Sequence, residues 1–122
     1  MEGHLDATNV AWLPVELPNG RIDFMIDTGF RGTLIVGEEL FDPSQADWAG
    51  ELQADLAAGQ SWMYLTYLVE VLWHSELTRI EVLIGPGTEC LIGTDLLHPH
   101  RLEIDYHHRS VQLLMNEDWH AQ

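Results

Sequence analysis

Residues 24–30 read Phe-Met-Ile-Asp-Thr-Gly-Phe, an apolar run that ends on one carboxylate. A carboxylate at the end of a buried strand is costly unless it is paired or hydrogen-bonded. Residues 32–36, Gly-Thr-Leu-Ile-Val, are hydrophobic again and contain the β-branched side chains that favour a strand. We therefore expect Asp27 to lie at an inward-facing bend between two strands, which makes it the first candidate for a functional residue.

A second motif lies in the other half of the chain, where residues 90–97 read Cys-Leu-Ile-Gly-Thr-Asp-Leu-Leu. Its pattern is two apolar residues, Gly, any residue, Asp and then Leu-Leu. Together with Asp-Thr-Gly at 27–29, it resembles the two signatures of the retropepsin-like aspartic proteases (clan AA). The Phe that follows the first motif matches a prokaryotic branch of this clan, which reads Asp-Thr-Gly-Phe. The motifs stand in the expected order, and the resemblance covers roughly residues 10–114.

The resemblance implies that Asp27 is catalytic and that each chain supplies one such Asp. The sequence has a single Asp-Thr-Gly and is too short for two lobes, so a homodimer must supply the second carboxylate. The resemblance also implies that the Thr28 hydroxyl cross-links the two catalytic loops, that Gly29 lets the substrate backbone approach, and that Gly93 packs behind the loop. Asp95 would bond Arg or backbone groups as structural support, or equally act as a carboxylate at a helix N-terminus.

The rest of the pattern predicts an all-β domain. Strand-like runs alternate with turn signals such as Asn19-Gly20, and only a brief helix is expected, at 94–97. We predict one domain over residues 1–122, a single-lobed, small closed acid-protease-like barrel with a flap hairpin and one short helix. Residues 1–9 and 116–122 are expected to be loose arms. In dimeric members of the family both termini add strands to the subunit interface, so the first arm could become ordered on dimerisation.

The segment before the flap is ambiguous. Residues 44–47 resemble a capping box, and Trp48, Leu52 and Leu56 recur at helical spacing. Residues 51–56, however, alternate polar and apolar side chains as a strand does. We expect the flap strand from about Leu52 onward and allow a short helix before it.

The flap should cover a substrate cleft formed by Phe30, Ala58, Gly59 and Trp62. Its tip is predicted at residues 57–60. In the strand from 61 to 73, odd-numbered side chains from Met63 onward should share one face, with Trp62 and Tyr64 on the other face near the substrate. Phe30 is bulkier than the small residue of viral relatives and would narrow the cleft.

The charge of the chain is strongly negative, with 20 Asp and Glu against 5 basic residues, all of them Arg. Nucleic acids and anionic membranes would repel a net charge of -15, so we expect neither as a partner. No apolar run approaches the ~20 residues of a membrane-spanning helix, and the first residues do not resemble a signal peptide. Cys90 has no second cysteine to pair with and is interpreted as a small buried hydrophobe. We expect a cytoplasmic protein.

The histidines offer a metal site as an alternative. His98 and His100 flank a proline, and His107 and His108 are adjacent, but neighbouring His side chains in a turn point apart and no Cys or Glu stands at a zinc spacing. We expect no metal and no cofactor. The sequence thus predicts an aspartic endopeptidase that cleaves a peptide or protein substrate as a homodimer. The alternative is a non-catalytic barrel that binds a peptide or small ligand in the flap cleft.

Overall fold

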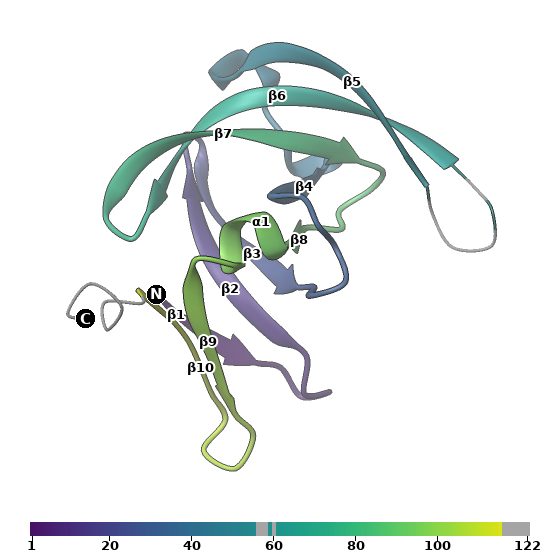
Figure 1. Ribbon diagram of the computed structural model, residues 1–122. Coiled ribbons are helices and arrows are strands. Elements are labelled where there is room, and N and C mark those ends of the chain that lie inside the picture. The colour runs from purple at the N-terminus through teal and green to yellow at the C-terminus, as the bar shows by residue number, and fades with distance from the viewer. Residues whose placement is uncertain (56–58, 60, 116–122) are drawn as a thin grey trace.

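The computed structural model describes residues 1–55, 59 and 61–115 (Figure 1). The strands in these residues are β1 (Glu2–Leu5), β2 (Ala11–Leu17), β3 (Gly20–Ile26), β4 (Leu34–Gly37), β5 (Asp47–Asp55), β6 (Ser61–Trp73), β7 (Glu76–Gly85), β8 (Leu91–Ile92), β9 (His100–Asp105) and β10 (Ser110–Met115). The 3-10 turns η1 (Glu38–Leu40) and η2 (Pro43–Gln45) precede β5, and the helix α1 (Thr94–Leu97) follows β8. The predicted all-β class with a short helix is confirmed.

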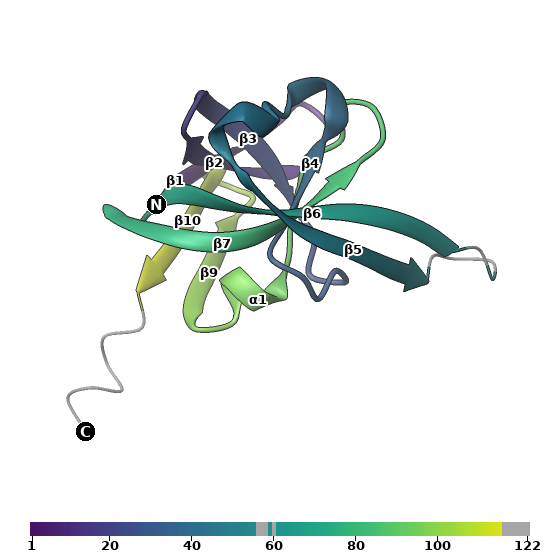
Figure 2. The ribbon, with the colours of Figure 1, turned by 90° about the horizontal axis from the view of Figure 1, so that it is seen from above.

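The strands form one 10-stranded sheet in the order β5-β6-β7-β4-β8-β3-β2-β1-β10-β9. A further pairing between β6 and β2, at Leu72 and Glu16, closes 6 of these strands into a barrel. The strand β5 lies outside the closed barrel and forms a hairpin with the first half of β6, which projects away from the body (Figures 1 and 2). The strands β1, β10 and β9 extend the sheet beyond β2. The predicted small closed barrel is therefore confirmed.

The barrel interior is filled by apolar side chains that alternate along its strands. Leu13 and Val15 of β2 point inward, as do Phe24 of β3, Leu34 of β4 and Ile92 of β8, and none of these five is more than 1% exposed. Strands of period two place alternate side chains on one face, so Leu13 and Val15 both enter this core while Pro14 between them stays partly exposed. This core is the base on which the candidate site is built.

The hairpin of β2 and β3 is the first element that positions the site. Its turn contains Asn19 and Gly20, and Gly20 has a φ of +136°, a conformation that side-chain-bearing residues rarely adopt. The register sets Leu17 opposite Gly20 and Trp12 opposite Met25. The predicted hairpin is thus present, and β3 ends directly before Asp27.

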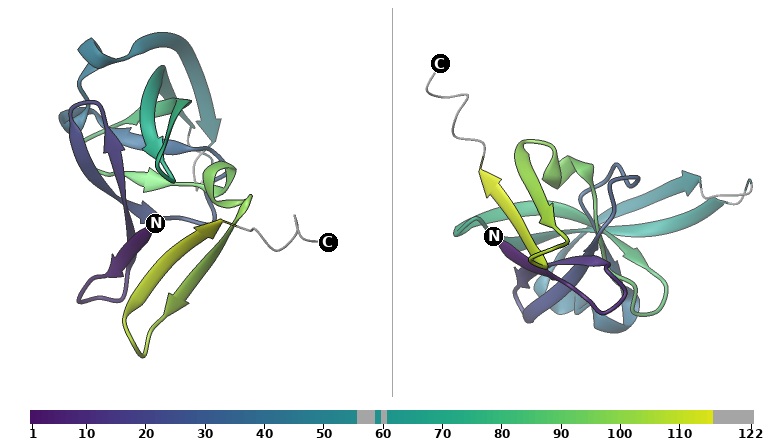
Figure 3. Two further views of the ribbon diagram at one scale, coloured as in Figure 1. Left: turned by 90° about the vertical axis from the view of Figure 1, so that its left-hand side faces the viewer. Right: turned by 90° about the horizontal axis from the view of Figure 1, so that it is seen from below.

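The prediction of a loose arm at residues 1–9 is wrong for its first part. Glu2–Leu5 forms β1, which pairs with β10 on one side and with β2 on the other (Figure 3). This segment has little apolar pattern of its own, and its order depends on backbone pairing with strands that the sequence places far away. The other predicted arm, 116–122, lies outside the described residues.

The turn after β1 is organised by Asp6. Its carboxylate accepts hydrogen bonds from the Trp12 indole N–H at 2.8 Å, from the Thr8 hydroxyl at 2.7 Å and from the backbone N–H groups of Thr8 and Val10. These bonds, the one from Trp12 above all, hold the pKa of Asp6 well below its usual range. Residues 6–10 are therefore a structured turn rather than part of a loose arm.

The ambiguous segment before the flap is a strand along most of its length. The strand β5 begins at Asp47, earlier than predicted, and pairs with β6 from Asp47↔Leu68 to Asp55↔Ser61, with an irregularity between Trp48 and Gly50. The helix allowed before it is only the turn η2. Trp48 and Leu52 are 64% and 47% exposed, so the helical spacing of apolar residues has no core to pack against. Leu56 lies outside the described residues.

The two predicted faces of β6 are present, but the face that is buried changes along its length. Val69, Val71 and Trp73 are buried in the barrel core, whereas Met63 and Leu65 are exposed and Tyr64 and Thr66 are buried instead. The reason is that the first half of β6 leaves the barrel to pair with β5, so its even-numbered side chains meet the cleft while its odd-numbered ones face outward.

Within the described residues, no helix has the length and apolar character needed to cross a membrane.

Candidate active site

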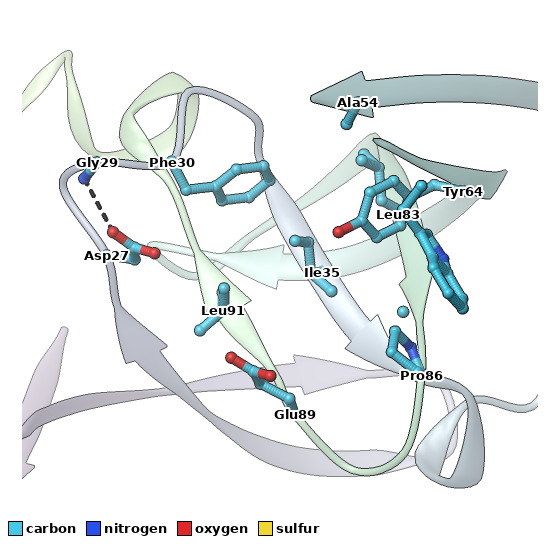
Figure 4. A pocket seen from close by; sticks show the side chains of 12 residues that line it. Asp27, Gly29, Phe30, Ile35, Ala54, Tyr64, Leu83, Pro86, Glu89 and Leu91 are labelled. Atoms are coloured by element: carbon cyan, nitrogen blue, oxygen red, sulfur yellow. Dashed lines mark hydrogen bonds between the residues drawn. The ribbon is translucent and has the colours of Figure 1, made fainter. Parts of the chain in front are cut away.

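Asp27 follows β3 and lines a cleft (Figure 4). Its backbone N–H donates to the carbonyl oxygen of Ile92 at 3.0 Å, which continues the parallel pairing of β3 with β8. Its carboxylate Oδ1 accepts a hydrogen bond from the backbone N–H of Gly29 at 2.9 Å. The Phe30 N–H donates to the Asp27 carbonyl at 3.2 Å and tightens the turn. The side chain is half-buried, so the carboxylate has both a fixed position and an open side.

The second motif braces this turn from behind. Gly93 donates its N–H to the carbonyl of Thr33 at 2.8 Å, and a Cβ on Gly93 would clash with the carbonyl oxygens of Gly32 and Phe30 and with the Phe30 ring. Only glycine permits such close backbone packing. Gly93 thus packs directly against the turn that holds Asp27.

Thr94 is a supporting residue that sequence reasoning did not single out. Its backbone N–H donates to the Phe30 carbonyl at 2.8 Å, and its hydroxyl donates to the same oxygen at 3.3 Å. The only signal in the sequence was its place between Gly93 and Asp95 in the second motif. Asp95 donates its backbone N–H to Gly32 at 3.2 Å, and its exposed side chain lies in the first turn of α1.

The cleft has a volume of about 630 Å³ and a mostly apolar wall. Asp27, Gly29 and Phe30 come from the first motif, and Leu91 comes from the second. The remaining lining residues are Ile35, Ala54, Trp62, Tyr64, Leu83, Gly85, Pro86 and Glu89. Ile35, Tyr64 and Leu83 form a buried cluster separate from the barrel core, with Phe30, Ala54 and Leu91 packed on it. This small second core forms the floor of the cleft.

Two of the predicted cleft residues, Phe30 and Trp62, are brought together at this cleft. Gly59 is exposed, with a φ of +76°, and does not line the cleft as far as the structure describes it, while Ala58 lies outside the described residues. Thr28 is exposed beside Asp27. Sequence reasoning did not predict Glu89, which brings a second carboxylate to the cleft from a loop that had only a turn signal.

Two groups near the cleft are perturbed by their surroundings. Burial raises the pKa of the Tyr64 hydroxyl, and the negative charge of Glu89 raises it further. Burial also raises the pKa of the Cys90 thiol. Cys90 is 4% exposed and belongs to the barrel core, so it has the features of a packing residue rather than of a reactive thiol.

The histidines that the structure describes are not arranged as a metal centre. In the described part of the chain, no group of three or more His, Cys, Asp or Glu side chains is placed to hold a metal ion. His108 instead pairs its Nδ1 with Asp105 at 2.8 Å. His100 accepts a hydrogen bond from the Trp73 indole at 3.2 Å, and its ring centre lies 4.5 Å from that of His74.

Comparison with known proteins gives a structural answer only. No protein-family model matches the sequence, and no curated protein matches it. Among solved structures, a retropepsin-like aspartic protease from Rickettsia conorii is similar, with a TM-score of 0.66 and 19% sequence identity over 94% of this chain and 89% of the other. The EIAV protease, in complex with the inhibitor HBY-793, is similar with a TM-score of 0.63 and 12% identity over 76% of this chain and 89% of the other.

Both similar structures are proteases by name, the first of them a retropepsin-like aspartic protease, and this chain covers 89% of each. The identities are low, so the likeness concerns the path of the backbone. It matches the resemblance that the two sequence motifs carry. The chain has the fold of the retropepsin-like aspartic proteases.

Proposed function

We propose that this protein is an aspartic endopeptidase that acts as a homodimer, with Asp27 of each chain forming the catalytic pair. The observation that carries the proposal is the position of Asp27, fixed by backbone hydrogen bonds at the wall of an apolar cleft in a retropepsin-like barrel. Apolar clefts with a few fixed polar groups are typical of substrate sites. The single barrel carries one Asp-Thr-Gly, so a pair of carboxylates needs a second copy.

The chemistry follows from placing two carboxylates side by side. Aspartic proteases are the standard example: two carboxyl groups about 3 Å apart cannot both ionise, so they share one proton. The ionised Asp27 takes a proton from a water molecule as the water attacks the peptide carbonyl carbon. The protonated Asp27 of the other copy donates its proton to the carbonyl oxygen, and the transfers reverse when the amine leaves.

The neighbouring residues support this role in different ways. The Gly29 N–H bond to Oδ1 fixes the orientation of the carboxylate, and orientation is a large part of catalytic rate. The Thr28 hydroxyl, exposed beside the acid, is free to meet the other catalytic loop in a dimer. The β5–β6 hairpin brings Ala54, Trp62 and Tyr64 to the cleft and would close over a bound peptide.

The decisive experiment is peptide cleavage by the wild type and by Asp27→Asn, across about pH 3 to 8, because the operating pH of the pair is open. A diverse peptide mixture is the substrate. Asp95→Asn is the matched control, since it removes an exposed carboxylate from the second motif. We expect cleavage by the wild type and by Asp95→Asn, none by Asp27→Asn, and no effect of a chelator.

Subunit mixing tests the homodimer separately. If both copies of Asp27 are needed, an equal mixture of wild type and Asp27→Asn should have about one quarter of the activity of wild type at the same total protein concentration. The reason is that only dimers of two wild-type chains are active. Activity that falls only to one half would contradict a shared site. If the wild type cleaves no peptide at concentrations where dimers form, the result would instead favour a binding protein that holds a peptide or small ligand in the cleft.

A further inference from the structure

Glu89 is the charged group of the cleft that the proposed reaction does not use. It lies in the loop between β7 and β8, two residues before Leu91, and both residues line the cleft with Asp27 (Figure 4). Catalysis by a pair of Asp27 carboxylates gives Glu89 no role. An acidic side chain in an otherwise apolar cleft therefore needs its own explanation.

The carboxylate of Glu89 has no cationic partner among the described residues. Their ion pairs join Arg21 to Glu16, Arg79 to Asp47, Arg101 to Glu103 and His108 to Asp105. Arg109 is occupied by Asn9 and by the backbone carbonyls of Leu5 and Asp6. In the described part of the cleft wall there is no basic residue. Arg31, which follows Phe30, is exposed and forms no ion pair within the described residues, so the Glu89 carboxylate faces solvent and is available to a cationic ligand.

The surroundings of Glu89 suit a long side chain with an apolar stem. Pro86 and Leu91 line the same wall, and the cleft also contains the rings of Trp62 and Tyr64. Arginine and lysine bury their stems along apolar surface and keep the charged head at a polar group. Burial raises the pKa of the Tyr64 hydroxyl, and the charge of Glu89, which also lines the cleft, adds to this rise. A ligand between these residues would lie within that field.

We propose that Glu89 makes one subsite of this cleft select a basic side chain, with arginine preferred over lysine, in the peptide substrate. The inference rests on the proposed peptidase function. The planar guanidinium can bond both oxygens of a carboxylate, and it also stacks on aromatic rings, whereas an ammonium acts as a point charge. The net charge of -15 adds long-range attraction for basic peptides.

The test compares three side chains at each position of a positional-scanning octapeptide library: arginine, citrulline and glutamate. Citrulline has nearly the shape of arginine without the charge, so the arginine-to-citrulline ratio of kcat/KM isolates the electrostatic part. Because Glu89 is exposed, we expect a ratio of about three to ten at one position for the wild type. The ratio should fall to about one in Glu89→Gln, and in Glu89→Arg glutamate should become preferred.

Glu76→Gln is the matched control, because it removes the same charge from an exposed residue at the β6–β7 turn, outside the lining of the cleft. It should keep the wild-type ratio. Raising the salt concentration to about 1 M should shrink the ratio of the wild type, because the screening length falls to about 3 Å. A ratio of one in the wild type, or an equal ratio in wild type and Glu89→Gln, would overturn the role of Glu89.

Binding to Asp27→Asn separates this inference from the peptidase proposal. Titration calorimetry of that variant with the arginine and citrulline peptides should show the same three- to tenfold preference, removed by adding Glu89→Gln. If neither the wild type nor any variant cleaves a peptide but the binding preference for arginine persists, the peptidase proposal fails. The role of Glu89 in selecting arginine is then retained. If cleavage depends on Asp27 but shows no preference for arginine, the peptidase proposal is supported and the role of Glu89 is overturned. A Glu89→Gln change that alters only the dimer dissociation constant would assign Glu89 to the subunit contact and overturn the subsite.

Discussion

The Asp27 turn and the β5–β6 hairpin contribute to the same cleft, but the chain holds them in opposite ways. The turn is locked by backbone hydrogen bonds from Asp27 to Ile92, from Gly93 to Thr33 and from Thr94 to Phe30. A close contact of Gly93 leaves no room for a side chain there. The hairpin has little packing on its outer side, where Met63 and Leu65 are 52% and 43% exposed. The Asp27 turn is thus fixed by contacts within one chain, whereas the β5–β6 hairpin exposes apolar side chains.

In the proposed peptidase, this difference would assign different tasks to the two regions. A catalytic carboxylate must be held within a fraction of an ångström of its working position, which needs short-range contacts that exist before substrate arrives. A flap must open and close, so few buried contacts are an advantage there. Exposed apolar side chains grouped on one element are typical of a surface that a ligand or partner covers. Three predictions test the comparison.

The largest expected effect is on stability and separates the barrel from the hairpin. Phe24 is fully buried in β3, directly before the Asp27 turn, whereas Met63 is half exposed in the hairpin. We expect Phe24→Ala to lower the free energy of unfolding by about 3 to 5 kcal/mol and Met63→Ala to change it by about 0.5 kcal/mol or less. Urea unfolding of both variants measures this. Similar losses in both would mean that the hairpin is part of the same packed core.

A smaller effect is expected from two glycines within the site. Gly93→Ala would force a Cβ against the Gly32 and Phe30 carbonyls, which cannot move without the turn, so we expect a loss of about 1 to 3 kcal/mol. A Cβ on Gly29 would meet only the Asp27 Oδ1, at 3.3 Å. Gly29→Ala should therefore unfold almost as the wild type does but cleave peptides poorly. Urea unfolding and a cleavage assay on both variants would contradict this if Gly29→Ala were the less stable protein.

The smallest effect is on the pH dependence of stability and comes from His74 and His100, at the end of β6 opposite to the flap. Burial, aided by the facing ring and the amino terminus, lowers the pKa of His74, and burial lowers that of His100. His74 Nε2 and His100 Nδ1 are buried without partners in the described structure. A lowered pKa means that the unfolded chain binds more protons below pH ~6.5, so stability is full above this pH and falls as the pH drops toward the folded-state values.

The measurement is urea unfolding at pH 7.5 and 5.5 for the wild type and for the double variant His74→Gln, His100→Gln. The double variant should lose less stability on acidification than the wild type does. His4→Gln, at an exposed residue of β1, is the control and should behave as the wild type. If the free energy of unfolding depends on pH equally in all three proteins, His74 and His100 are not the cause of the loss of stability at low pH.

Local sequence was sufficient where a motif carries its own geometry. The hairpin turn at Gly20 was predicted because its positive φ is a property of the turn itself. The inward bend at Asp27 followed from an apolar run that ends on a carboxylate. The strand β5 was only half predicted, because its residues satisfy both helical and strand spacing, and pairing with β6 decided between them.

The sequence by itself determined the all-β class and the two motifs, because alternation, turn chemistry and motif spacing are local properties. Barrel closure was predicted as well, but it is made by the pairing of β6 with β2, which is not local. Only the tertiary structure decided that residues 2–5 form a paired strand, that the buried face changes along β6, and that Glu89 lies in the cleft. Each of these depends on which distant strand or loop lies alongside. The backbone pairing of β1 with β10, more than a hundred residues away, leaves no signal in residues 1–9, where Met1, Leu5 and Ala7 are the only apolar side chains.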